Sequence, residues 1–123
     1  MLQKLPPRSR LGLAALVLVF GVAVQALGWW SGARLGEQVA SSARPGDIRM
    51  LASVSCIYCA QARAWFDRHH VPFTECLIEQ DAQCAAAYDA LRAPGTPVLL
   101  VRGKALVGFS AQAVADALAT RSQ

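Results

Sequence analysis

The feature that most constrains this chain is an unbroken apolar segment near its beginning. Residues 11–30 form a run of twenty without a charged side chain, and Gln25 is its one strongly polar member. At about 1.5 Å per residue, a helix of this length reaches roughly 30 Å, the thickness of a bilayer's hydrocarbon core. The rest of the chain is too short to surround a helix that is apolar on every face. The sequence therefore predicts a transmembrane anchor over residues 11–30.

Charged and aromatic residues at the ends of this segment indicate its orientation. Three basic residues precede it: Lys4, Arg8 and Arg10. Trp29 and Trp30 close it, at the depth where interfacial aromatic side chains usually lie. We therefore expect residues 1–10 in the cytoplasm and the C-terminal part on the periplasmic or extracytoplasmic side of the inner membrane. A cleaved signal peptide is the alternative, although its apolar stretch is usually only about 7 to 15 residues.

The composition changes after the apolar segment. Residues 31–46 are rich in Gly, Ser and Ala and end in Pro-Gly, which is typical of a flexible tether. Residues 47–123 then remain for a single domain. The net charge of +4 is spread along the chain, and no basic run interleaved with aromatic residues follows the anchor. Nucleic acid is therefore not an expected partner, whereas membrane lipid is.

Strand and helix patterns alternate along the expected domain. Apolar stretches with β-branched residues predict four strands, at residues 48–54, 73–78, 98–101 and 105–107. A helix is expected between Cys59 and His69, and helical spacing predicts two more, at residues 81–92 and 111–120, the former capped by Asp81. The order βαβαββα predicts an α/β domain with one sheet and helices on its faces.

Cys56 and Cys59 stand where the first predicted strand leads into the first predicted helix. Free N–H groups and the positive end of the helix dipole lie there, so we expect a Cys56 thiolate to be stabilised. Two intervening residues let Cys59 reach back over one turn and resolve a mixed disulfide on Cys56. Half of a zinc site and a static disulfide are the alternatives. Zinc normally needs four ligands, and no second pair at zinc spacing follows, so no metal is expected.

The segment from Ser53 to Arg63 resembles the glutaredoxin signature. It reads Ser-Val-Ser-Cys-Ile-Tyr-Cys-Ala-Gln-Ala-Arg, with Ile57 in place of the family's proline and a basic residue four positions after the second cysteine. Gly-Thr-Pro-Val at residues 95–98 is similar to the family's Thr-x-Pro turn, with one residue fewer. The resemblance covers about residues 48–118. It implies a thioredoxin-like fold of the glutaredoxin type, with a central four-stranded mixed sheet.

The resemblance also implies roles for individual residues. Cys56 would be the attacking sulfur and Cys59 the resolving thiol. Pro97 would follow a cis peptide bond beside the disulfide, and Thr96 would offer its backbone to an extended substrate. The expected substrate-binding residues are Tyr58, Thr96, Pro97, Gly108 and Phe109.

The glycine turn after the fourth strand bears on glutathione. Gly108-Phe109 is more similar to the NrdH-type redoxins than to the double glycine of glutathione users. Those members commonly follow the turn with an aspartate, whereas residues 110–112 here read Ser-Ala-Gln. We therefore expect no resident cofactor and retain glutathione only as a co-substrate to be tested.

Cys76 and Cys84 fall outside the signature. Cys76 lies in the second predicted strand and Cys84 in the first turns of the following helix, with seven residues between them. A structural disulfide forms if strand end and helix start fold back on each other, since the Cα atoms must come within about 4.4 to 6.8 Å. A second redox pair and two free thiols are the alternatives.

Taken alone, the sequence predicts a membrane-anchored thiol–disulfide oxidoreductase that exchanges with protein thiols and disulfides or with small thiols. A thioredoxin-fold module that binds copper or an iron–sulfur cluster is one alternative. A non-catalytic docking domain tethered to the membrane is another. His69 and His70 are interpreted as solvent-facing turn residues, and Trp65 and Phe66 as core.

Overall fold

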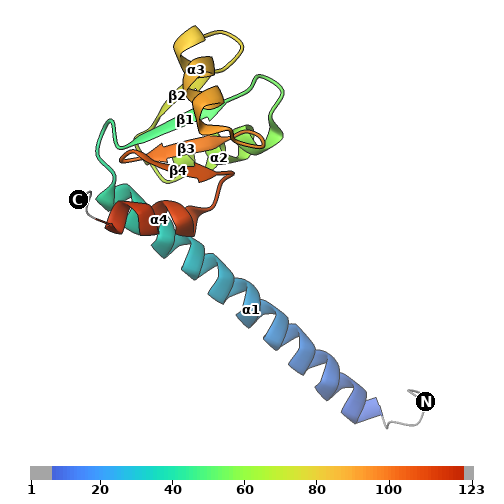
Figure 1. The fold of residues 1–123 in the computed structure, drawn as a ribbon. Coiled ribbons are helices and arrows are strands. Elements are labelled where there is room, and N and C mark those ends of the chain that lie inside the picture. The colour runs from blue at the N-terminus through green and yellow to red at the C-terminus, as the bar shows by residue number, and fades with distance from the viewer. Residues whose placement is uncertain (1–6, 121–123) are drawn as a thin grey trace. The chain divides into compact units, whose positions relative to one another are not determined.

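The computed structural model describes residues 7–120, which divide into two compact units between Ala33 and Arg34. Residues 1–6, part of the expected cytoplasmic segment, and residues 121–123, the end of the expected domain, lie outside the described residues. Figure 1 shows the elements. Their bounds are α1 (Pro7–Ser42), β1 (Ile48–Ala52), α2 (Ile57–Arg68), β2 (Thr74–Leu77), α3 (Ala82–Leu91), β3 (Val98–Val101), β4 (Lys104–Val107) and α4 (Ala111–Ala119).

The second unit is built on a four-stranded mixed sheet in the order β2-β1-β3-β4. β1 runs parallel to β2 and antiparallel to β3, and β3 and β4 form an antiparallel hairpin. Arg102 and Gly103 make its turn, both with positive φ, as a two-residue hairpin loop of this hand requires. The predicted element order and the mixed sheet are confirmed.

The two faces of the sheet carry cores of different size. Alternate residues of a strand point to opposite faces, so Met50 and Leu99 lie in the larger core while Leu51 and Val98 lie in the smaller one. The larger core also takes buried side chains from α2, α4 and the end of α1. The smaller core is covered by α3, whose one buried residue is Cys84. Helices α3 and α4 therefore lie on opposite faces of the sheet, and Figure 1 shows α3 near β2 and α4 near β4.

Helix α1 begins as the apolar segment of the sequence. By length and composition it is long and apolar enough to cross a membrane, and it lies near the N-terminus. Its large apolar side chains between Leu11 and Trp30 are exposed within the chain. These properties fit a membrane span or a signal sequence.

The expected flexible tether over residues 31–46 differs from the structure, because α1 continues to Ser42. Its last turns belong to the second unit, where Val39 is fully buried and Leu35 packs against the same core. Leu35 and Val39 are four positions apart, so they lie on one face of the helix. The small residues around Leu35 and Val39 allow the helix to pack closely on this core. From composition alone, we had interpreted the same small residues as a sign of flexibility. Only residues 43–47 connect α1 to β1 without helix or strand.

Arg102 holds the end of α1 against the rest of the second unit. Its guanidinium donates hydrogen bonds to the carbonyl oxygens of Ser42 (3.1 Å) and Leu118 (2.6 Å) and pairs with the Asp47 carboxylate at 3.0 Å. The Arg102 hydrogen bond lowers the pKa of Asp47, and a hydrogen bond from the Arg44 backbone N–H adds to this effect. The Arg102 side chain thus joins the β3–β4 turn to the end of α1, to α4 and to the residue before β1.

Candidate redox site

Cys56 and Cys59 occupy the turn between β1 and α2. Cys56 is the N-cap of α2, with extended backbone, and is joined to Cys59 by a disulfide whose Cα atoms are 5.2 Å apart. The backbone N–H of Cys59 donates to Cys56 Sγ at 3.0 Å. The sulfur therefore takes the place that a serine or aspartate oxygen usually has at a helix start. After reduction, the same N–H and the helix end would stabilise a Cys56 thiolate.

The two sulfurs of this disulfide differ in access to solvent. Cys56 is partly buried, whereas Cys59 is completely buried in the larger core. An incoming thiol or disulfide can therefore meet Cys56, and Cys59 can react with a sulfur already attached to Cys56. This order of access agrees with the roles expected from the sequence.

A groove of about 260 Å³ lies beside the disulfide turn. It is lined by Tyr58, Gln61, Thr96, Pro97, Gly108 and Phe109. The Thr96–Pro97 peptide bond is cis, as the resemblance implied. The structure thus brings the five expected substrate-binding residues together along one groove. Gln61, the sixth lining residue, was missed, but it lies one turn after Tyr58 on α2, on the same face.

Gly108 fixes the wall of the groove opposite α2. Its φ is +80°, a conformation that residues with a Cβ rarely adopt. Its N–H donates to the carbonyl oxygen of Pro97 at 2.8 Å. The glycine turn and the cis-proline turn are therefore held together by a backbone hydrogen bond.

Glu79 supports the loop before Cys56 and was not found by sequence reasoning. Its carboxylate accepts a short hydrogen bond from the Ser53 hydroxyl and another, at 3.3 Å, from the Val54 backbone N–H. The Ser53 bond is the main cause that lowers the pKa of Glu79. The Cys56 N–H donates to the Ser53 carbonyl oxygen at 3.3 Å, closing the turn. No local pattern could reveal this contact, since the partners are separated by 26 positions.

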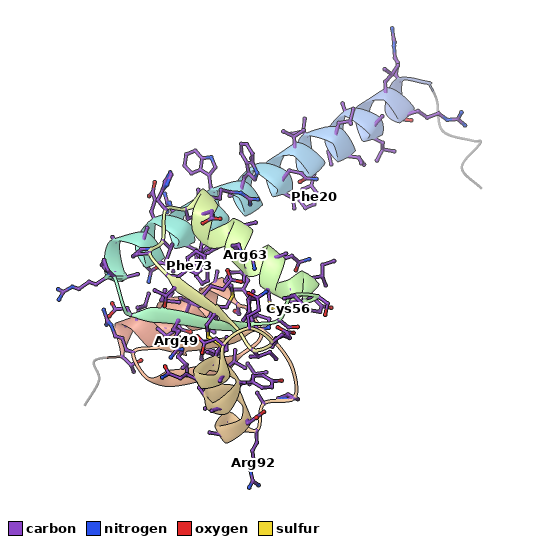
Figure 2. The ribbon with its side chains drawn as sticks, turned by 90° about the horizontal axis from the view of Figure 1, so that it is seen from above. Phe20, Arg49, Cys56, Arg63, Phe73 and Arg92 are labelled. Carbon is purple, nitrogen blue, oxygen red and sulfur yellow. A yellow bond between two sulfur atoms is a disulfide. The ribbon has the colours of Figure 1, made fainter. Side chains whose placement is uncertain are left out.

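Arg63, the basic residue of the signature, is already paired. Its guanidinium makes two hydrogen bonds to the Glu75 carboxylate of β2, one from Nε at 2.8 Å and a shorter one from Nη2. The hydrogen bonding to Glu75 raises the pKa of Arg63. Arg63 is labelled in Figure 2. Its charge is therefore directed to β2 and is not part of the groove lining.

An aromatic cluster supports the groove from below. Phe109 lies 5.4 Å, between ring centroids, from both Trp65 and Phe66. Phe66 is fully buried and Trp65 packs on the core, which agrees with their interpretation as core residues. His70 is exposed as expected, but His69 is half-buried with its ring 4.6 Å from that of Trp65. His69 is therefore only partly solvent-facing, because Gly36 of α1 lies against its ring.

Cys76 and Cys84 are joined by a second disulfide, with Cα atoms 6.0 Å apart. Asp81 caps α3 by accepting hydrogen bonds from the N–H groups of Gln83 and Cys84. Cys76 lies on the face of the sheet that α3 covers. The Cα separation lies within the range of about 4.4 to 6.8 Å that the sequence analysis required for pairing.

The described residues, 7–120, contain no group of three or more His, Cys, Asp or Glu side chains arranged to hold a metal ion. All four cysteines are engaged in the two disulfides.

The domain is similar to known proteins in both sequence and structure. Residues 48–106 match the glutaredoxin family model. A mutant of the thioredoxin-like protein BC3987 is similar in structure, with a TM-score of 0.53 and 19% identity over 59% of this chain and 95% of that one. Methanoredoxin of Methanosarcina acetivorans is also similar, with a TM-score of 0.51 and 20% identity over 66% and 93% of the two chains. No curated protein shows significant sequence similarity to this chain.

These similarities agree with the site geometry. The structural neighbours show the fold, and the family match includes both cysteines of the first disulfide. Together with Cys56 and Cys59 at the start of α2, the match indicates thiol–disulfide redox chemistry. The part of the chain that carries these cysteines is thus a domain of the thioredoxin fold that matches the glutaredoxin family over residues 48–106.

Proposed function

We propose that this protein is a membrane-anchored thiol–disulfide oxidoreductase whose redox domain works on the non-cytoplasmic side of the membrane. The observation that carries the proposal is the Cys56–Cys59 pair. Cys56 is partly exposed and caps the start of α2, Cys59 is buried, and a groove runs beside them. This arrangement supplies an activated sulfur, a resolving sulfur and a place for a substrate.

The reaction follows from the two sulfurs. In the dithiol form, the Cys56 thiolate attacks one sulfur of a substrate disulfide, and the other substrate sulfur leaves as a thiolate. The Cys59 thiolate then attacks Cys56 Sγ and releases the second substrate thiolate. Two electrons pass to the substrate, and the protein is left with the Cys56–Cys59 disulfide seen in the structure. Every step is reversible, so the Cys56–Cys59 disulfide can also oxidise a substrate dithiol to a disulfide and return to the dithiol form.

A reductase assay with matched variants tests this chemistry. The reduced protein should convert a disulfide-linked fluorogenic peptide to its thiols with release of both halves. Cys56→Ser should abolish the reaction, whereas Cys59→Ser should stop at a stable mixed disulfide visible by mass spectrometry. Absorption spectra and metal analysis of the purified protein provide the control, since a bound copper ion or iron–sulfur cluster would favour the metal-binding alternative. Equal rates in both serine variants and the unchanged protein would contradict the proposal.

The proposal that the domain lies on the non-cytoplasmic side is supported by the charges before the apolar segment. Arg8 and Arg10 precede residue 11, and cytoplasmic flanks of membrane spans carry an excess of Lys and Arg. The exposed apolar side chains between Leu11 and Trp30 support a lipid-facing span. A membrane-impermeant thiol reagent, applied after mild reduction of intact cells, should label Cys56. Labelling of Cys56 only after lysis would contradict this topology and place the domain in the cytoplasm.

A further inference from the structure

The large apolar side chains that the domain leaves exposed are concentrated at the redox site. Between residues 34 and 120 they are Val54, Ile57, Tyr58, Leu91 and Val107. Val54, Ile57 and Tyr58 lie within two positions of Cys56, and Val107 precedes Gly108 of the groove. Val54, Ile57 and Tyr58 are 63%, 67% and 63% exposed. Apolar surface collected beside a reactive sulfur marks a place where a partner binds.

The charges near this surface do not suit an anionic ligand. The groove lining contains no Lys, Arg, Asp or Glu. Arg63, the basic residue of the signature, is bound to Glu75. The carboxylate of Glu79 is fixed at the Val54 backbone and stays ionised at neutral pH, because its pKa is lowered.

Polar groups after the glycine turn are also engaged within the protein. Ser110 Oγ accepts the N–H of Ala113 as the cap of α4. The side-chain amide of Gln112 donates to the Asp116 carboxylate at 2.9 Å. Neither side chain is among the residues that line the groove.

We propose, resting on the function proposed above, that the substrate is a polypeptide cysteine flanked by apolar side chains, in preference to glutathione. Glutathione carries two carboxylates and one ammonium group, and the groove offers no opposite charge to either sign. A polypeptide bonded to Cys56 can instead place apolar side chains on Val54, Ile57 and Tyr58 and remove them from water. Exposed cysteines with apolar neighbours occur in chains that have not finished folding, so such chains are the substrate class.

The test compares three disulfides in single-turnover reactions of the reduced full-length protein in detergent. Two are homodimeric disulfides of short peptides of equal length, one with Leu and Phe beside the cysteine and one with Ser and Asp there. The third is oxidised glutathione. We expect the apolar peptide to react about tenfold faster than the acidic peptide and faster than glutathione, as burial of one large apolar side chain would produce.

Two variants connect the preference to this surface. A Val54→Ser, Ile57→Ser protein should lose most of the preference for the apolar peptide, measured as the ratio of its rates with the apolar and the acidic peptide, so that any change in the reactivity of Cys56 itself cancels. Leu91→Ser, at the end of α3, removes an exposed apolar side chain outside the groove lining and should keep the full preference. Circular dichroism spectra of both variants establish that the fold is intact.

The outcomes separate this inference from the function on which it rests. If glutathione reacts as fast as the apolar peptide, or if Val54→Ser, Ile57→Ser keeps the preference, the substrate class is wrong and the oxidoreductase function stands. If none of the three disulfides reacts with the reduced protein, the proposed function itself is wrong.

Discussion

Gly36 of α1 lies directly against the imidazole ring of His69, so closely that a β-carbon at position 36 would overlap the ring atoms. His69 cannot easily turn away, because its ring also packs on Trp65. Gly36 is buried and has helical backbone. Its lack of a side chain, rather than an unusual φ, is therefore what this position requires.

Gly36→Ala should destabilise the domain, although alanine favours helix formation. Overpacking a filled site costs about 1 to 3 kcal/mol, whereas the gain in helix propensity is about 1 kcal/mol. We expect a net loss of roughly 1 kcal/mol, measured as a lower melting temperature in detergent. Gly32→Ala is the matched control, because a β-carbon there meets no atom within 4 Å. A Gly36→Ala, His69→Ala protein should recover stability relative to His69→Ala alone. A melting temperature for Gly36→Ala above that of the unchanged protein would show that His69 yields freely.

Cys56 should be alkylated before Cys59 in the reduced protein. Its sulfur is the more accessible of the two and stands at the start of α2, where N–H groups stabilise a thiolate. We expect at least a tenfold difference in rate near neutral pH, measured by mass spectrometry of iodoacetamide-treated protein after digestion. Faster labelling of Cys59 would exchange the roles of the two sulfurs.

Glu79→Gln should slow the reaction of Cys56 by loosening the loop before it. A glutamine oxygen can replace one carboxylate oxygen, but its NH₂ group cannot accept the second hydrogen bond. We expect a several-fold lower rate of mixed-disulfide formation at pH 7, with Glu37→Gln on α1 as a control that keeps the full rate. Equal rates for Glu79→Gln and the unchanged protein at pH 7 would show that Glu79 does not affect the reactivity of Cys56.

The effect of Glu79 should also depend on pH. Its pKa is lowered from the ordinary value of 4.5, chiefly by the Ser53 hydrogen bond. The ionised carboxylate therefore supports the loop fully above that value, and the support is lost as the pH falls through the lowered pKa. The stability of the unchanged protein should approach that of Glu79→Gln only in this acidic range, as equilibrium urea unfolding at a series of pH values would show.

Removal of the second disulfide should weaken the domain without stopping its chemistry. Cys76 and Cys84 are separated by eight positions, a loop for which the chain-entropy estimate is about 2 to 3 kcal/mol. Cys76→Ala, Cys84→Ala should therefore unfold at lower urea concentration and still reduce a peptide disulfide at 25 °C. Loss of activity in a variant that remains folded would favour the second-redox-pair alternative.

Local patterns predicted much of the fold. Strand and helix periodicities are set by near neighbours, and the cap at Asp81 follows from one residue at a helix start. The two cysteines of the turn could be assigned roles because their chemistry depends on a strand–helix junction visible in the sequence. The pairing of Cys76 with Cys84 could only be stated as a condition, since it depends on which face of the sheet α3 covers.

The parts that escaped prediction depend on contacts between distant segments. The end of α1 is helical because Leu35 and Val39 find a core made by later elements, and small residues beside them suggested the opposite. The contact of Glu79 with Ser53 arises only when β2 is placed next to β1. The contact of Arg102 with Ser42 likewise joins residues 60 positions apart and forms only in the folded domain.

The unequal cores on the two faces of the sheet set the order in which amide protons should become exposed. Helix α3 contributes a single buried side chain, and that side chain is half of the Cys76–Cys84 disulfide. Its backbone can therefore open locally while β1 and α2 stay closed, because they share the larger core. Hydrogen exchange of the α3 amides would report this sub-global opening. Exchange of the amides around Cys59 would report global unfolding. A protein that undergoes cycles of oxidation at one end of the sheet can thus tolerate fluctuation over the other face without losing the geometry of its reactive turn.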